Sequence, residues 1–581
     1  NLLAQLLGDA NGADESLRLD GVGYLTARVR GSLQSPEAVA EAVVFDGRVG
    51  DLGAEIAVVN LNLVERELRI TQAQILRRAA QLVASGAVQL PETPDQPPRF
   101  QLAGDLYEFD LASIPDWLRR ELPLAGLASG RFEAQGEPQA WQLRASLYAE
   151  SLQYDQTVVR DNTAQVIVQA QDGAVQVDVV SAQARVADGA LLARGQWRSD
   201  GQFEAQWLLE NAALDALAPY LPVEYRLTGQ ATVQGEASGT PDAPNVRVQL
   251  QGSQIALNGA LLGDLEGWVA VSAHGESDTP LLTSPVNGGG TQPPSPRAGR
   301  AGVGAFQADF TLRTPDGEAR LALHECDLQR LQVRLTAETS ALPIEWLQRV
   351  ARAVPNALPP AVAERIETLQ GTVQASLSLE GALREPLAQL RLNAEQLEWR
   401  AQSLGSLSVQ AEWVGASDAD ALDADTDLAH AVETVRRLRT QRAVLQQLRW
   451  QAETARLEAQ ARYTPERLTA DLEAAQLPLR WARLWEPSLP EVDGALDLSL
   501  IADGAPESPE LTLSATVNQL AYAGYTVDQI LFSQIEAREG VIQTDDALIR
   551  MGDYQTRLSG RLPFRWSPIA IPDDEPIRIQ A

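Results

Sequence analysis

The chain has 581 residues, of which 45% are hydrophobic and 22% charged, and its formal net charge is −31. All 47 basic residues are arginines, which excludes Schiff-base chemistry and a phosphate-binding loop lysine. The single cysteine, Cys326, excludes an intramolecular disulfide and multi-cysteine metal sites. The three histidines, His274, His324 and His430, form no paired metal motif. We therefore expect no enzymatic activity, no cofactor and no metal site.

Two further classes of function are disfavoured by the composition. Nucleic-acid binding calls for a basic stripe, and no arginine-rich run opposes the overall acidity. No run of eighteen apolar residues occurs, so we expect no membrane-spanning helix in these residues. The sequence begins at Asn1 and ends within an expected strand, and we interpret it as a fragment that lacks an N-terminal anchor.

A spacing signature, Gly-x9-Gly-x4-Pro, recurs along the chain. Its four full copies are Gly21, Gly31 and Pro36; Gly229, Gly239 and Pro244; Gly371, Gly381 and Pro386; and Gly494, Gly504 and Pro509. In a fifth copy, Gly126 and Gly136, the proline comes early at Pro138. We expect the glycines to mark strand ends or bends where φ > 0 or a close backbone approach is needed, and the proline to interrupt the ladder before the next strand.

Between the two glycines apolar and polar residues alternate, which predicts a half-buried strand. The strand that follows the proline alternates in the same way. We take the apolar positions of these segments as candidates for one continuous apolar surface. The candidates are Val175, Val177, Val179, Val246, Val248, Val373, Leu377, Leu379, Leu390, Leu392, Leu496, Leu498, Leu500, Leu511 and Leu513.

Short amphipathic helices are expected before the signature. Their predicted ranges are Ser113–Leu122, Leu214–Leu221, Ile344–Val354 and Leu479–Trp485. In three copies an aromatic residue, Trp117, Tyr220 or Trp485, stands nine residues before the first glycine. Such a helix either packs its aromatic side chain on the sheet as a plug or faces a membrane or lipid. The sequence leaves both interpretations open.

Successive copies of the signature lie 103 to 142 residues apart, too far for a solenoid coil. We expect five repeat units, each with one short helix and several strands, over residues 1–112, 113–213, 214–341, 342–476 and 477–581. The third unit contains a Pro/Gly/Ser-rich insertion at 279–304, which predicts a disordered loop. The fourth contains an acidic insertion at 416–430.

The acidic insertion is the nearest approach to a metal site. Asp418, Asp420, Asp423, Asp425 and Asp427 alternate, but Asp423 stands where a calcium loop needs glycine, and Ala429 takes the place of its glutamate. A solvated loop is favoured over weak calcium contact. The 12 tryptophans lie mostly in alternating segments, where core filling is favoured over carbohydrate stacking.

The order of short helix, glycine, alternating strand, glycine, proline and further strand resembles the repeats of the TamB/AsmA-like envelope proteins. Residues 214–222 (LDALAPYLP), followed by Gly229, Gly239 and Pro244, are similar to one of their repeat units, and so is the stretch 558–563 (LSGRLP). The resemblance covers essentially the whole chain and rests on repetition of degenerate motifs.

The resemblance implies a mainly β fold: a long twisted sheet curled into an open groove, with short amphipathic helices between its repeats. It implies a periplasmic, inner-membrane-anchored protein that carries phospholipids toward the outer membrane without catalysis. It also implies an Omp85-type outer-membrane barrel as a partner. The period-two alternation supplies the apolar wall that this function requires.

Two other functions remain open at this point. One is a scaffold or chaperone for outer-membrane proteins, whose edge strands pair with client strands. The other is a surface adhesin made of closed β-sandwiches. The sequence does not tell which lipid is carried, in which direction, or which strand face points inward, because a one-residue slip exchanges the faces.

Overall fold

The computed structural model describes residues 19–581 except for 33–35, 50–51, 94–95, 112–123, 155–156, 217–224, 242, 273–304, 328–331, 354–367, 383–384, 417–438, 482, 484–490, 523, 539, 564, 567–568, 571–577 and 581. The described residues form a 31-stranded sheet, a separate two-stranded sheet and a single α-helix, α3 (Ile344–Ala353). The predicted mainly β fold is confirmed. Most strands hold 10 to 15 residues, about twice the usual length.

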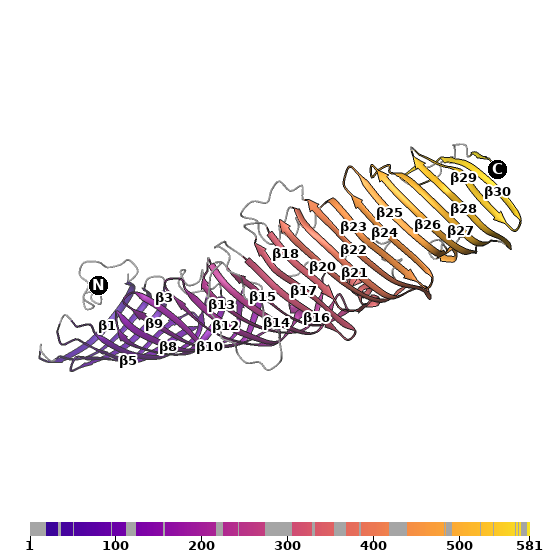
Figure 1. The fold of residues 1–581 in the computed structure, drawn as a ribbon. Coiled ribbons are helices and arrows are strands. Elements are labelled where there is room, and N and C mark those ends of the chain that lie inside the picture. Colours follow the sequence, from indigo (N-terminus) through magenta and orange to yellow (C-terminus); the bar gives the residue numbers. More distant parts are fainter. Residues whose placement is uncertain are drawn as a thin grey trace. The chain divides into compact units, whose positions relative to one another are not determined.

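The large sheet is an antiparallel meander that stays open. Neighbouring strands in the sequence pair with each other, and β1 pairs with β2 alone among the described strands. At the other end β30 pairs with β29 and with the short β33. Figure 1 shows the long strands from β18 to β30 following one another in chain order. The sheet is therefore an open, curled layer, as the resemblance implied.

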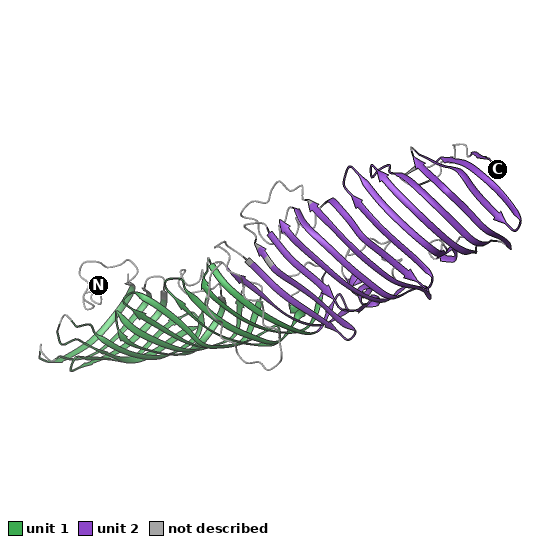
Figure 2. Ribbon diagram, viewed as in Figure 1, with its two compact units in different colours: residues 1–223, 227–253 green, residues 224–226, 254–581 purple. Residues whose placement is uncertain are grey.

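The chain divides into two compact units, coloured in Figure 2: residues 1–223 with 227–253, and residues 224–226 with 254–581. The strands of unit 1 are β1 (Leu19–Gly31), β2 (Pro36–Val49), β3 (Leu52–Val64), β4 (Glu67–Arg77), β5 (Ala80–Gln89), β6 (Arg99–Asp110), β7 (Leu124–Glu137), β8 (Ala140–Tyr154), β9 (Thr157–Gln171), β10 (Ala174–Val186), β11 (Gly189–Arg198), β12 (Phe203–Ala213) and β13 (Leu227–Thr240). The division between the units falls within β14 (Ala243–Leu257).

Unit 2 contains the remaining elements. They are β15 (Ala260–Ser272), β16 (Ala305–Thr314), β17 (Gly317–Asp327), β18 (Gln332–Thr339), β19 (Leu342–Pro343), α3, β20 (Leu369–Ala382), β21 (Glu385–Trp399), β22 (Gln402–Ala416), β23 (Arg439–Ala452), β24 (Ala455–Tyr463), β25 (Leu468–Pro478), η4 (Leu479–Trp481), β26 (Val492–Gly504), β27 (Glu510–Tyr522), β28 (Tyr525–Arg538), β29 (Val541–Met551), β30 (Tyr554–Pro563), β31 (Arg565–Trp566), β32 (Ile569–Ala570) and β33 (Arg578–Gln580).

The glycine signature occupies equivalent strands. Its five copies lie in β1, β7, β13, β20 and β26, so a signature strand returns at every sixth strand once the two-residue β19 is set aside. All ten glycines have φ between 89° and 141°, as predicted from their spacing. At Gly371, a Cβ would come within 2.8 Å of the Glu395 carbonyl oxygen, so both backbone shape and close approach require glycine there.

The first glycine of the signature sits at a β-bulge. The register shifts between Asp20 and Val22, between Gly126 and Ser129, between Gln370 and Thr372 and between Asp493 and Ala495. The prolines lie at the start of the next strand, where a missing amide is tolerated: Pro36 opens β2, and Pro244 and Pro386 are second in β14 and β21. Pro509 stands just before β27.

The connections that were predicted to hold helices leave from one edge of the sheet in each unit. They follow β6 and β12 in unit 1, and β18 and β25 in unit 2, strands that run in the same direction within their unit. We call this edge the helix edge. The predicted helix Ile344–Val354 is confirmed as α3. Residues 214–216 and η4 are single 3₁₀ turns, while the predicted helix Ser113–Leu122, the 279–304 insertion and Asp418–Asp427 lie outside the described residues.

Candidate functional site

The strand register places small and large apolar side chains in rows across one face of each unit, because residues that pair directly across antiparallel strands project from the same face. We call this face the apolar face. In unit 1 one such row takes a residue from each strand from β1 to β13. Its members are Ala27, Ala40, Leu61, Ile70, Gly86, Leu102, Ala134, Leu143, Val168, Val177, Trp197, Phe203 and Gly239.

An equally uninterrupted row crosses unit 2 from β15 to β30, again with β19 set aside. No charged or hydrogen-bonding side chain stands in it. Its members are Gly267, Phe310, Leu321, Ala337, Leu377, Leu390, Ala411, Leu445, Ala461, Ala470, Ala502, Leu511, Ala537, Ile542 and Leu562.

The apolar candidates on β10, β20, β21, β26 and β27 fall on this face. Val175, Val177 and Val179 alternate along β10, and Val246 and Val248 alternate along β14. Val373 is buried and the other candidates are half-buried. The ten candidates in unit 2 share one face, since Leu377 pairs with Leu390, Leu379 with Ala388, Leu392 with Ala375, and Leu500 with Leu513. The register thus places these ten residues together on one face of unit 2.

Several aromatic rings lie over glycines on the neighbouring strand. The Trp207 ring occupies the place where a Cβ of Gly235 would stand, Phe132 does so at Gly104 and Phe310 at Gly267. This pairing covers bare backbone with an aromatic ring and pins the register of the two strands. Trp141, Trp197, Trp207, Trp399, Trp413 and Trp450 belong to rows of the apolar face, which agrees with core filling.

Helix α3 packs on the apolar face of unit 2 at the helix edge. Ile344 clusters with Val373, Ala394 and Leu397 from β20 and β21. The Trp346 indole donates a hydrogen bond to the Leu262 carbonyl of β15, 3.2 Å away. Because β16, β17 and β18 separate β15 from β20 in the sheet, α3 bridges strands that lie four positions apart.

Polar contacts fix α3 at its middle and at its C-terminal end. The Gln348 amide donates to the Leu369 carbonyl at 2.7 Å, and the Asn258 amide donates to the Ala353 carbonyl at 2.6 Å. Trp346 is 7% exposed. For α3, the packed interpretation of the short helices therefore holds. At η4 the pattern recurs, because the rings of Trp481 and Trp450 meet edge to face with centroids 4.9 Å apart.

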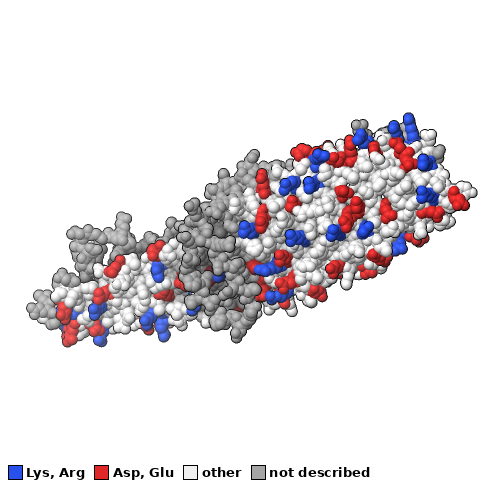
Figure 3. Space-filling view, in the orientation of Figure 1, with Lys and Arg blue, Asp and Glu red and all other residues white. Residues whose placement is uncertain are grey.

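The opposite face, which we call the polar face, carries the ionisable side chains. Next to the apolar row of unit 2 runs a row with Glu266, Thr311, Arg320, Glu338, Ser376, Arg391, Gln410 and Gln447. Acidic and basic side chains are interspersed over the visible strands of unit 2 in Figure 3.

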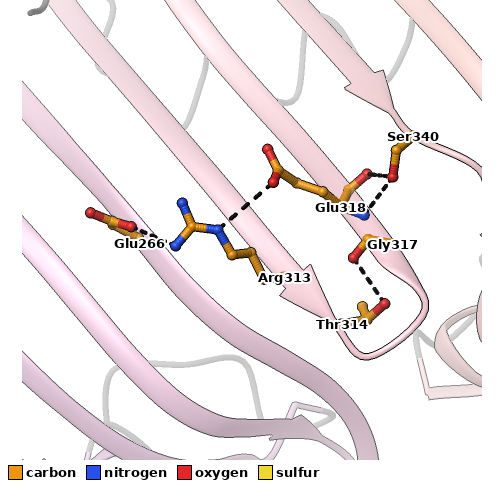
Figure 4. A network of polar contacts seen from close by, with 6 residues as sticks. All are labelled: Glu266, Arg313, Thr314, Gly317, Glu318 and Ser340. Carbon is orange, nitrogen blue, oxygen red and sulfur yellow. Dashed lines mark hydrogen bonds and ion pairs between the residues drawn. The ribbon is translucent and has the colours of Figure 1, made fainter. Parts of the chain in front are cut away.

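Cross-strand ion pairs and hydrogen bonds connect neighbouring strands on this face, as Figure 4 shows for β15 to β18. The Arg313 guanidinium lies 2.9 Å from Glu266 and 3.7 Å from Glu318, and the Glu318 amide donates to the Ser340 hydroxyl at 2.7 Å. The hydrogen bond from Arg467 holds the pKa of the Asp503 carboxyl below its ordinary value. All these groups are exposed, so each pair contributes little to stability.

The candidate site is therefore a surface and contains no cluster of reactive groups. Within the described part of the chain, no three His, Cys, Asp or Glu side chains gather as a metal site would require. None of the described helices has the length and apolar character needed to cross a bilayer. No family model matches this chain, and no curated protein sequence matches it either.

Sequence reasoning missed much of the apolar face in unit 1. Leu61, Leu102, Leu143 and Trp197 belong to it but were not among the candidates. The alternation of Leu143, Ala145 and Leu147 with polar neighbours was available as a signal. Because Ala145 is small, this signal was weaker than that of the leucine repeats of unit 2.

Proposed function

We propose that the apolar face shields the acyl chains of phospholipids, and that the protein conducts such lipids between two membranes without catalysis. The observation that carries this proposal is the register: apolar rows run unbroken from β1 to β13 and from β15 to β30. A chain of hydrocarbon can lie along such a row without meeting a polar side chain.

The size of the barrier explains why a continuous face matters. Bringing a two-chain lipid into water exposes roughly 30 methylenes at ~0.8 kcal/mol each, a cost of about 25 kcal/mol. A barrier of that height allows on the order of 10⁻⁶ events per second. A face that keeps the chains covered throughout removes most of this cost. Shielding alone is sufficient, so no residue needs to perform chemistry.

The resemblance to the TamB/AsmA-like envelope proteins supports the same proposal and supplies its setting. That setting is the periplasm of a cell with two membranes, with an inner-membrane anchor in the full-length protein. An Omp85-family barrel is a further proposed partner. The open curled sheet is the architecture that the resemblance implied.

Lipid retained by the purified chain tests the proposal. Expressed in a bacterium with two membranes, the chain is expected to co-purify with phospholipid that mass spectrometry detects. Leu498→Arg places a charge on the apolar face and is expected to lower the lipid content about tenfold or more. Its neighbour Ser499 lies on the polar face, and Ser499→Arg is the matched control. Lipid-free protein, or an equal loss in both variants, contradicts the proposal.

One observation favours the scaffold alternative. Strand β1 has one unpaired edge among the described strands, and it is unusually bare: Val22, Tyr24 and Leu25 are 67%, 69% and 66% exposed. Such an edge can accept a further strand. Capture of unfolded outer-membrane proteins in place of lipid favours this function. The adhesin alternative expected a string of closed sandwiches, whereas all but two of the described strands belong to one open sheet.

A further inference from the structure

The polar face of unit 1 contains a broad hollow that the proposed lipid function does not use. Its volume is about 1160 Å³, and its lining comes from β4 to β11 near the edge opposite the helix edge. Most of its side chains lie on the opposite side of the sheet from the apolar rows, because they alternate with Phe100, Trp141 and Val175 along their strands.

Five glutamines in direct register form the floor of this hollow. We call them the glutamine row. One stands on each strand from β6 to β10, and each pairs directly with the next: Gln101, Gln135, Gln142, Gln169 and Gln176. Strands lie about 4.8 Å apart, so the row offers a primary amide at every such step across the strands.

The side chains of the glutamine row do not form hydrogen bonds with one another. Among hydrogen bonds between described residues, none joins two side chains of the row, and Gln176 instead donates to Asp178 at 3.0 and 3.1 Å. Each amide can donate two hydrogen bonds and accept at its oxygen. The floor therefore presents both donors and acceptors to whatever enters the hollow.

The charges around the hollow disfavour an ionic ligand. The lining contains Glu67, Glu137 and Asp200 against Arg99 and Arg198. The Arg99 guanidinium is already paired with Glu137 at 2.8 Å. An anion finds no concentrated positive charge here, and a cation finds no close group of free carboxylates. A neutral ligand rich in hydroxyl groups fits the lining best.

The direction of the glutamine row further limits the kinds of ligand that the hollow can bind. The row runs across the strands, so a ligand that follows it needs polar groups repeated along its length. An extended peptide repeats its backbone groups about every 3.4 Å, so they fall out of step with amides that are about 4.8 Å apart. A carbohydrate chain carries hydroxyls on every ring. We propose that the hollow binds a neutral glycan chain laid across β6 to β10, held by the glutamine row.

Binding of labelled hexasaccharides to the full chain tests this proposal. The probes are β-1,4-linked glucose and N-acetylglucosamine hexamers, and fluorescence anisotropy follows the titration. Saturable binding of at least one hexamer is expected. Gln142→Ala with Gln169→Ala is expected to weaken it about 25-fold, because each lost hydrogen bond costs roughly fivefold.

The matched control is Gln165→Ala with Gln183→Ala, which removes two exposed glutamines from the same face of β9 and β10 outside the hollow. This variant is expected to bind within about twofold of the original chain. Circular dichroism and thermal unfolding establish that both variants fold. Failure of both hexamers to bind, equal weakening in the control, or preferential binding of an anionic polysaccharide overturns the proposal. Lipid content is expected to stay unchanged in both variants.

Discussion

The two faces of the sheet are built from alternate residues of the same strands, yet they are organised by different rules. On the apolar face, Leu377 sits in a row that continues from strand to strand without a polar member. On the polar face its neighbour Ser376 sits in a row that mixes Glu338 and Arg391 with uncharged groups. The apolar row is uniform in chemistry from strand to strand, whereas the polar row varies.

The proposed lipid path constrains the two faces differently. Polar residues of almost any kind keep a face in contact with water. Replacing a salt bridge by a pair of glutamines on such a face therefore changes stability little. A hydrocarbon path fails wherever one charged side chain interrupts it, because that charge must be desolvated. We therefore expect large effects on lipid retention from charges placed on the apolar face and small effects on it from changes to the polar face.

The largest expected effect comes from a charge in the middle of the unit 2 row. Leu377→Arg is expected to abolish most lipid retention, since the arginine stands between Ala337 and Leu390. Ser376→Arg on the same strand is expected to retain lipid. Mass spectrometry of lipid bound to each purified variant gives the comparison. Similar lipid contents in the two variants would contradict the proposal that only the apolar face holds lipid.

The next effect concerns the packing that holds α3 on the apolar face. Leu342 is fully buried and lies over Gly317 and beside Val373. Leu342→Ala is expected to lower the free energy of unfolding by about 3 kcal/mol, because it leaves a cavity. Leu347→Ala, at a side chain that is 36% exposed, is the control and is expected to cost much less. Chemical denaturation measures both, and equal losses would contradict this packing.

A smaller effect on stability is expected from a change at the β-bulge of Gly371. Gly371 has a φ of 134° and no room for a Cβ. Gly371→Ala is expected to destabilise the chain by about 1–3 kcal/mol through backbone strain. Ser376→Ala, on an ordinary strand position, is expected to change stability by less than about 0.5 kcal/mol. A Gly371→Ala variant as stable as the original would show that the bulge is not needed.

The smallest effect is expected from an ion pair of the polar face. Arg467 and Asp503 lie 2.8 Å apart and are both exposed. The pKa of Asp503 is lowered by its hydrogen bond from Arg467. Any stability from the pair is therefore present above the ordinary aspartate pKa and is lost as the pH falls through the lowered value. Thermal unfolding of Asp503→Asn is expected to match the original chain at strongly acidic pH and to fall slightly below it at neutral pH.

Local patterns were enough to predict the strand-rich fold. The alternation between Gly371 and Gly381 and the positive φ of both glycines follow from a few neighbouring residues. Helix α3 was also visible, because its apolar residues recur at helical spacing. These features depend on short stretches of chain, where propensity and periodicity act directly.

The register and the long-range contacts were not predictable in this way. Pairing of Gln135 with both Gln101 and Gln142 depends on hairpin lengths and on the bulge between Leu106 and Phe109. Contact between Trp346 and the Leu262 carbonyl joins residues 84 positions apart. The glutamine row and the contacts of α3 with β15 and β20 therefore become apparent only when the pairing of the strands is known.

Photocrosslinking along one strand tests the central claim most directly. A photoreactive amino acid is placed in turn at Ala375, Ser376, Leu377, Ser378 and Leu379 of β20, and lipid adducts are counted after illumination in cells. Adducts at Ala375, Leu377 and Leu379 with little at the two serines are predicted, a period of two that matches the apolar face. Equal labelling at all five positions, or labelling at the serines alone, would contradict a lipid-shielding apolar face.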